Sequence, residues 1–171
     1  AGVHALGQVA NFKIENTSIP IEKMAVALNS KLKRSIRIQK AEEVDLQFHA
    51  RYHCKQKTYY YVIDNTEQGS AIYRNLEYHM PIPLDVEKMK QAISYFEGEH
   101  DFKGFKASGT SSKSSVRTIY KADVATENGK VFVQLTGNGF LYNMVRIIAG
   151  TMVDVGLRKN KTRRNSRHYC F

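Results

Sequence analysis

Apolar and polar residues alternate along several segments of the chain, which is the pattern of half-buried β-strands. The clearest case is "VDLQFHARYHC", in which every second residue from Val44 to Cys54 faces one way and the charged or polar residues face the other. Asn128-Gly129, between two further alternating segments, is a strong signal for a tight hairpin turn. The predicted strands are residues 7–14, 44–54, 58–64, 116–127 and 130–137, with 58–64 expected as the hairpin partner of 44–54.

Apolar residues spaced three or four apart predict three helices, over residues 20–33, about 85–96 and 141–155. Strands and helices therefore alternate along the chain without an internal repeat. This order predicts an α+β fold with a largely antiparallel sheet and packed helices. Residues 103–117 are rich in Gly and Ser and are expected to form a loop.

The predicted helix over residues 141–155 is apolar nearly all round but carries Arg146. At 100° per residue, Arg146 falls on a narrow polar strip with Asn143, Gly150 and Asp154. A buried arginine is costly unless a negative group meets it. One interpretation is that Arg146 pairs with Asp154 or reaches solvent. The other is that it holds a carboxylate or phosphate in a functional cleft.

The net charge of +10 is unevenly distributed. Residues 157–171 hold six Lys/Arg and no acid, whereas the first 156 residues hold 20 basic and 16 acidic side chains, a net of +4. The body is thus only mildly basic, which by itself is weak support for a polyanionic partner. No apolar run is long enough to span a membrane and no signal peptide is visible, so no membrane association is expected. Two cysteines form no disulfide framework and are consistent with a cytoplasmic protein.

Motifs for metals and cofactors are missing from the sequence. His49 and His53 would lie roughly 13 Å apart on a strand, too far for one ion, and Cys54 would face the other way. No phosphate-binding loop and no dinucleotide fingerprint occur. We therefore expect neither a metal nor a cofactor.

Two segments could contact nucleic acid. The run Tyr59-Tyr60-Tyr61 is either ordinary strand packing or a platform on which an unpaired base stacks, with Tyr59 and Tyr61 on one face. The loop over residues 103–117 is either a simple connection or a phosphate-contacting loop. In the second case its basic side chains would bind, namely Lys103, Lys106, Lys113 and Arg117.

Four stretches, in this order, resemble the TruA-type tRNA pseudouridine synthases. They are "AGVHALGQVANF", "FHARYHCKQKTYYYVI", "GEHDFKGFKASGTSSKSSVRTIY" and "GNGFLYNMVRIIAGTMVDVG", and the resemblance covers about residues 1–157. It implies the pseudouridine synthase fold and an isomerase that converts uridine to pseudouridine at positions 38–40 of the tRNA anticodon arm, without cofactor or metal, as a homodimer. By the same resemblance Tyr59 would stack on the target uracil, Leu141 would lie beside the base pocket, and Arg146 would pair with the catalytic aspartate.

The resemblance also implies that the catalytic aspartate is not among residues 1–171. In the family, "AGVHA" directly follows Arg-Thr-Asp, whereas here it begins at Ala1. The expectation is therefore a fragment cut at both ends, with residues 1–157 as a partial catalytic domain and 158–171 as a basic tail that is non-native or disordered. Asp101 and Asp154 are poor substitutes because neither lies in the required motif. Such a fragment is expected to be inactive alone, and the alternative is a non-catalytic RNA-binding remnant.

Overall fold

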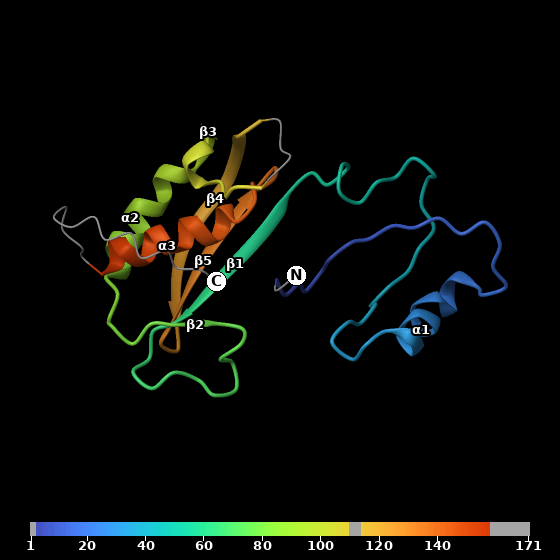
Figure 1. Ribbon diagram of the computed structural model, residues 1–171, viewed down its shortest axis with the longest axis horizontal. Coiled ribbons are helices and arrows are strands. Elements are labelled where there is room, and N and C mark those ends of the chain that lie inside the picture. Colours follow the sequence, from blue (N-terminus) through green and yellow to red (C-terminus); the bar gives the residue numbers. More distant parts are fainter. Residues whose placement is uncertain (1–2, 110–113, 158–171) are drawn as a thin grey trace. The chain divides into compact units, whose positions relative to one another are not determined.

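The computed structural model describes residues 3–109 and 114–157, so the basic tail and Lys113 lie outside the described residues. The chain divides into two compact units, Ala1–Cys54 and Lys55–Phe171 (Figure 1). Of the α-helices in the described residues, two of three belong to the second unit, together with the sheet. Among the described residues, none of the helices has the length and apolar character needed to cross a lipid bilayer.

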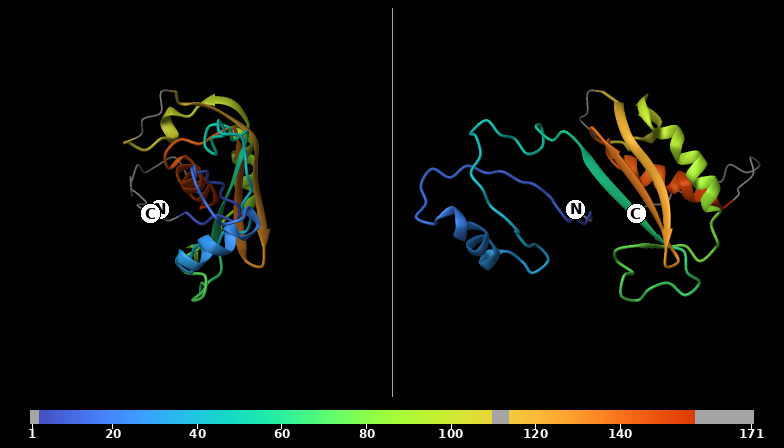
Figure 2. Two further views of the ribbon diagram at one scale, coloured as in Figure 1. Left: turned by 90° about the vertical axis from the view of Figure 1, so that its right-hand side faces the viewer. Right: turned by 180° about the vertical axis from the view of Figure 1, so that it is seen from behind.

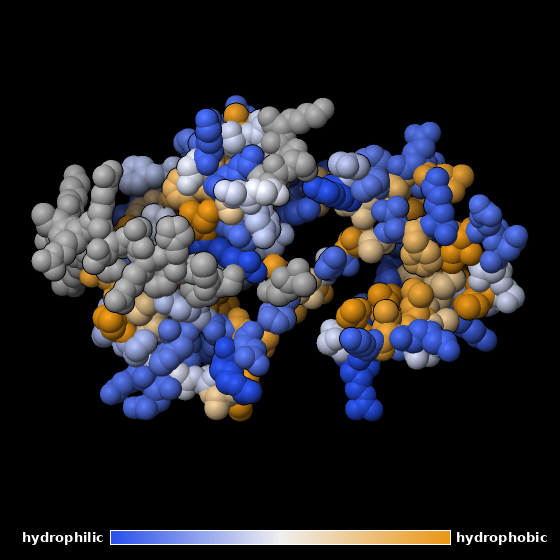
Figure 3. Space-filling model, viewed as in Figure 1, coloured by the Kyte–Doolittle hydropathy of each residue, from blue (hydrophilic) through white to orange (hydrophobic). Residues whose placement is uncertain are grey.

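The first unit contains one α-helix, α1 (Ile21–Lys31), as predicted. The two predicted strands in this unit are wrong, because residues 7–14 are irregular and residues 44–54 form turns. Here polar side chains, and not a neighbouring strand, accept hydrogen bonds from backbone N–H groups. The His49 ring accepts from the Arg51 N–H at 3.2 Å, and the Asn11 side chain accepts from the Ala50 N–H at 2.9 Å. Apolar side chains such as Leu46, 79% exposed, consequently lie at the surface of this unit (Figure 3).

The second unit is built on a five-stranded sheet in the order β2-β1-β5-β4-β3 (Figure 1). Only β1 and β2 are parallel, so the prediction of a largely antiparallel sheet in an α+β fold is confirmed. The expected partner of residues 58–64 was wrong, because this segment pairs with β5 and β2. The strands are β1 (Lys57–Asp64), β2 (Tyr78–His79), β3 (Gly98–Asp101), β4 (Val116–Glu127) and β5 (Lys130–Gly137).

The helices α2 (Val86–Ile93) and α3 (Met144–Gly156) cover one face of this sheet (Figure 2). One single-turn 3₁₀ helix, Ser94–Phe96, follows α2. Another, Lys103–Phe105, forms the first part of the segment over residues 103–117 that was predicted to be a loop. The core lies between this sheet face and the helices, and its fully buried members include Ile63, Met89, Val133, Leu135, Met144 and Ile148. Alternation along β1 therefore turns Tyr59, Tyr61 and Ile63 toward the helices and Tyr60 toward the other face.

The hairpin between β4 and β5 turns at Asn128 and Gly129, as predicted. Their φ angles are 50° and 77°, so both residues have the left-handed backbone that this kind of two-residue turn requires. A Cβ added to Gly129 would also lie 2.7 Å from the Thr66 Cγ2 atom. The glycine is thus required by its backbone angles and by the space around it.

We expect Gly129→Ala to destabilise the second unit by about 1–2 kcal/mol, the cost of a left-handed backbone for a residue with a Cβ. Gly150→Ala is the matched control, because a Cβ at this helical position would meet no atom within 4 Å. The control should be neutral or slightly stabilising, since alanine favours helix. Urea unfolding followed by circular dichroism compares the two variants, and equal midpoints would contradict the prediction.

Candidate functional site

Two connecting segments leave the sheet at the same edge. Lys57, at the start of β1, pairs with Gly137 at the end of β5, and Gly137 pairs with Ile119 near the start of β4. The turn over residues 138–143 and the segment over residues 102–115 therefore both emerge here. We call this side of the sheet the loop edge. The first turn of α3 begins here, directly after residues 138–143.

Tyr59 and Phe140 form an aromatic pair at the loop edge. Their ring centroids are 5.1 Å apart and their planes meet at 85°, an edge-to-face contact. Tyr59 is half-buried, whereas Leu141, the next residue after Phe140, is only 5% exposed. Tyr59 therefore packs against the turn that precedes α3 and keeps part of its surface accessible.

Arg146 lies in the first turn of α3 and is half-buried. Its Nη1 atom donates to the Asn143 side-chain oxygen at 3.0 Å. Asn143 has a left-handed backbone, with φ of 58°, so α3 begins at Met144 and not at Leu141 as predicted. Among the residues that the structure describes, no carboxylate forms an ion pair with Arg146. A guanidinium has five N–H groups, and those that the Asn143 oxygen does not engage can donate to an anionic group.

The two acids considered as substitutes have other positions. Asp154 is exposed and lies two helical turns beyond Arg146, about 12 Å along the axis. Asp101 accepts from the Lys103 backbone N–H at 3.0 Å and thus holds the start of the short 3₁₀ helix. Hydrogen bonds from the Ser115 hydroxyl and the Lys103 N–H lower the pKa of the Asp101 carboxyl. Its oxygens are engaged within its own loop, so it serves a structural role there.

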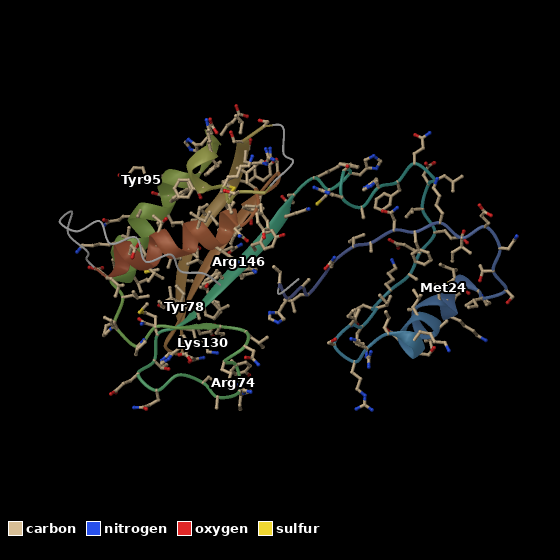
Figure 4. The ribbon with its side chains drawn as sticks, in the orientation of Figure 1. Met24, Arg74, Tyr78, Tyr95, Lys130 and Arg146 are labelled. Carbon is tan, nitrogen blue, oxygen red and sulfur yellow. The ribbon has the colours of Figure 1, made fainter. Side chains whose placement is uncertain are left out.

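Two further tyrosines lie on β1 and β2. Tyr61 follows Tyr59 on the same face of β1, and Tyr78 lies on β2 beside Ile63 (Figure 4). Burial raises the pKa of the Tyr61 phenol to about 12, the nearby Tyr78 adds to this rise, and the Arg146 guanidinium opposes it. The alternating pattern places Tyr61 on the face of Tyr59, but it does not predict the electrostatic effect of Arg146, because alternation carries no information about which helix covers the strand.

The basic side chains predicted to contact phosphate are distributed around the loop edge. Arg117 lies at the start of β4 and not in the loop, and a Cβ at Gly139 would lie 3.7 Å from its Nε atom. The Ala107 backbone N–H donates to the Tyr142 carbonyl oxygen at 3.1 Å, which brings Lys106 beside the turn before α3. Lys103 is exposed in the 3₁₀ helix. The structure thus brings together Tyr59, Leu141, Arg146, Lys103, Lys106 and Arg117 at one edge of the sheet.

The loop edge thus combines an aromatic ring, several basic side chains and an arginine without an acidic partner among the described residues. Such a site in an α+β domain is suited to bind an anionic ligand that carries a planar base. A family model described as tRNA pseudouridine synthase matches residues 1–53 and 92–167. The chain therefore belongs to the tRNA pseudouridine synthase family. The matched ranges include Leu141 and Arg146, and Tyr59 lies between them.

Curated relatives agree with this family. The chain is 51% identical over 158 residues to "tRNA pseudouridine synthase A" of Acetivibrio thermocellus, covering 92% of this chain and 64% of that protein. It is 51% identical over 160 residues to the protein of the same name from Caldicellulosiruptor saccharolyticus, covering 94% and 65%. It is 50% identical over 161 residues to "tRNA pseudouridine synthase A 2" of Clostridium perfringens, covering 94% and 66%. The chain thus spans slightly less than two thirds of the length of these relatives.

Proposed function

We propose that this chain is part of a tRNA pseudouridine synthase that isomerises uridine at positions 38–40 of the anticodon arm. The observation that supports this function best is Arg146, which is half-buried, held by Asn143 and not paired with any described carboxylate. An arginine in this state is ready to receive an acidic group, and a charge-assisted pair with two parallel hydrogen bonds would keep that group ionised and oriented. The names of the relatives supply the substrate class.

The reaction assigns a task to each residue at the loop edge. The target uridine must leave its stack, and the Tyr59 ring offers an aromatic face that offsets part of the lost stacking. Leu141 would border the base. A carboxylate held by Arg146 would act as nucleophile or base while the N1–C1′ bond breaks and a C5–C1′ bond forms. The C5 proton is lost and N1 gains one, so no oxidant, metal or cofactor is needed.

The carboxylate would come from outside residues 1–171. In the family it is the aspartate of Arg-Thr-Asp directly before "AGVHA", which corresponds to the position before Ala1. The remaining parts of the proposal are that Lys103, Lys106, Lys113 and Arg117 contact tRNA phosphates, that the protein acts in the cytoplasm as a homodimer, and that residues 1–157 are a partial catalytic domain.

A fusion protein tests this proposal. An N-terminal segment ending in Arg-Thr-Asp would be joined to Ala1, and release of tritium from tRNA labelled at uridine C5 would be measured. We expect product from the fusion, and none from residues 1–171 alone or from the fusion with that aspartate changed to alanine. A folded fusion without product would contradict the enzyme assignment. Product from residues 1–171 alone would show that another acid replaces the aspartate.

A second candidate function is RNA binding without chemistry, which the cluster of basic side chains at the loop edge favours. Tyr59→Ala should then weaken binding of an anticodon stem-loop by residues 1–171 about tenfold or more, because stacking of one base on an aromatic ring contributes about 1–3 kcal/mol. Tyr60→Ala is the control, since Tyr60 is 58% exposed on the opposite sheet face. Fluorescence anisotropy at two salt concentrations measures both. Equal affinities for the two variants would exclude stacking on Tyr59.

A further inference from the structure

Positive charge is concentrated in one ten-residue segment of the first unit. Residues 31–40, "KLKRSIRIQK", hold five Lys/Arg and no acid. The first 156 residues hold 20 basic and 16 acidic side chains, so without this segment they would hold 15 basic and 16 acidic. The segment therefore accounts for the whole positive surplus of this part of the chain. We call residues 31–40 the basic segment, and its charged members are Lys31, Lys33, Arg34, Arg37 and Lys40.

The basic segment has a defined backbone, because a tight turn follows α1 directly (Figure 1). The Ile36 backbone N–H donates to the Lys33 carbonyl oxygen at 2.9 Å, which places Arg34 at the tip of the turn. The Asn29 side chain, on α1, ties the far side of the turn to the helix. It donates to the Ile38 carbonyl oxygen at 2.9 Å and accepts from the Ile38 N–H at 2.8 Å. A turn held in this way presents its side chains from a fixed frame, which lowers the entropic cost of binding a partner.

The charges of the basic segment are exposed and largely unbalanced. All five basic residues are exposed. Lys40 forms an ion pair with Glu42, and the other four form none with any acid that the structure describes. The Arg37 Nη1 atom donates to the Lys33 and Ile36 carbonyl oxygens, which holds this guanidinium beside the turn. The turn thus gathers positive charge on one small surface.

The end of α1 explains only part of this charge. The helix dipole stabilises cations at a helix C-terminus, but its effect is confined to the last turn. Lys31 lies in that last turn, whereas Arg34 and Arg37 lie beyond it. Like charges that lie close together repel each other and disfavour the compact state of the isolated protein. A partner rich in negative charge accounts for the cluster, because it would offset this repulsion.

We propose that the basic segment binds phosphate groups of the RNA backbone, with Lys33 and Arg34 as its central contacts. This inference rests on the proposed function, which supplies tRNA as the polyanion. Lysine offers a point charge to a phosphate, and arginine offers two parallel hydrogen bonds. Phosphate contacts position an RNA without reading its sequence. The basic segment therefore adds affinity, whereas the target base is recognised at the loop edge.

Fluorescence anisotropy of labelled tRNA with residues 1–171, over a series of salt concentrations, tests this proposal. The double variant Lys33→Gln/Arg34→Gln should raise the Kd about tenfold or more at about 0.1 M salt. The slope of log affinity against log salt should become shallower by about 2, because each lost phosphate contact removes about one released counterion.

The double variant Arg74→Gln/Lys90→Gln is the matched control. It also removes one arginine and one lysine, both from exposed positions in the second unit, where Lys90 pairs with Glu87 at 2.9 Å. Net charge changes equally in the two double variants, so any difference between them reports on position. The control should keep the wild-type slope. Circular dichroism of both variants verifies that they stay folded.

Equal slopes for the two double variants overturn the proposal, as does tRNA binding that is too weak to measure at about 20 mM salt. Vesicles of phosphatidylcholine and phosphatidylserine are tested alongside. If Lys33→Gln/Arg34→Gln loses vesicle binding but keeps its RNA affinity, the segment binds anionic lipid instead and the proposal is wrong. The tritium-release assay remains separate. An inactive fusion with a shallower slope in this variant contradicts the proposed function alone, and an active fusion with an unchanged slope contradicts the role of the basic segment alone.

Discussion

Arg146→Met in the Arg-Thr-Asp fusion is expected to lower the turnover number for pseudouridine formation by about 10²–10³-fold, the range found when one preorganised polar group is removed from an active site. Methionine keeps much of the aliphatic stem but removes the charge and all five N–H donors. The incoming carboxylate would then lie in a half-buried site without a partner, which raises its pKa and leaves its orientation undefined.

Arg146→Lys distinguishes charge from geometry in the same assay. Lysine keeps the positive charge but lacks the planar fork that binds a carboxylate with two parallel hydrogen bonds. We expect a loss of turnover intermediate between wild type and Arg146→Met. Full activity of the lysine variant would show that only charge is required at this position.

Arg74→Met is the matched control for Arg146→Met. Arg74 is exposed in the loop between β1 and β2, and its Nη1 atom donates to the Ala71 carbonyl oxygen (Figure 4). This loop leaves β1 at Asp64, the end opposite the loop edge. Tritium release by this variant should match that of the unmodified fusion. If Arg146→Met is as active as Arg74→Met, Arg146 does not hold the reacting carboxylate.

Ile148→Ala is expected to destabilise the second unit by about 3–4 kcal/mol, a large share of the stability of a small domain. Ile148 is fully buried in α3 at the centre of the core between sheet and helices. Removing three carbon atoms there loses their transfer free energy and leaves a cavity that the surrounding β-sheet and helices fill only in part. The hydrogen exchange of β5 amides should accelerate accordingly, because β5 is the central strand.

Ile72→Ala provides the same chemical change at the surface. Ile72 is 83% exposed, so its truncation should alter the free energy of unfolding by less than about 0.5 kcal/mol. Urea denaturation and hydrogen exchange of both variants measure the difference. Similar unfolding midpoints would mean that Ile148 is not part of a packed core.

The hairpin over residues 116–137 could be predicted from sequence because the information is local. Alternating strands and the Asn128-Gly129 turn specify each other within about 20 residues, and the structure confirms that the two strands pair as a hairpin. The start of α3 could not be predicted to the residue. Asn143 adopts a left-handed backbone there, and an apolar pattern that continues through Leu141 does not reveal it.

The strands predicted over residues 7–14 and 44–54 failed for a different reason. An alternating pattern of apolar and polar residues indicates that a segment is able to lie on a sheet. A strand forms only where a neighbouring strand pairs with its backbone N–H and C=O groups. In the described part of the first unit, the side chains of His49 and Asn11 take some of these bonds instead. Apolar side chains that the pattern assigns to a core, such as Leu46, consequently stay exposed.

The sequence by itself determined the α+β class, the helices, the central hairpin and the family resemblance, because short-range periodicity and ordered motifs encode them. It left open whether Arg146 pairs with Asp154, and the structure shows instead that Asn143, just before α3, accepts a hydrogen bond from the guanidinium. Only the tertiary structure shows that the Tyr59 ring meets the Phe140 ring edge to face. This contact joins residues more than 80 positions apart, and only the pairing of β1 with β5 and the packing of the turn before α3 bring them together.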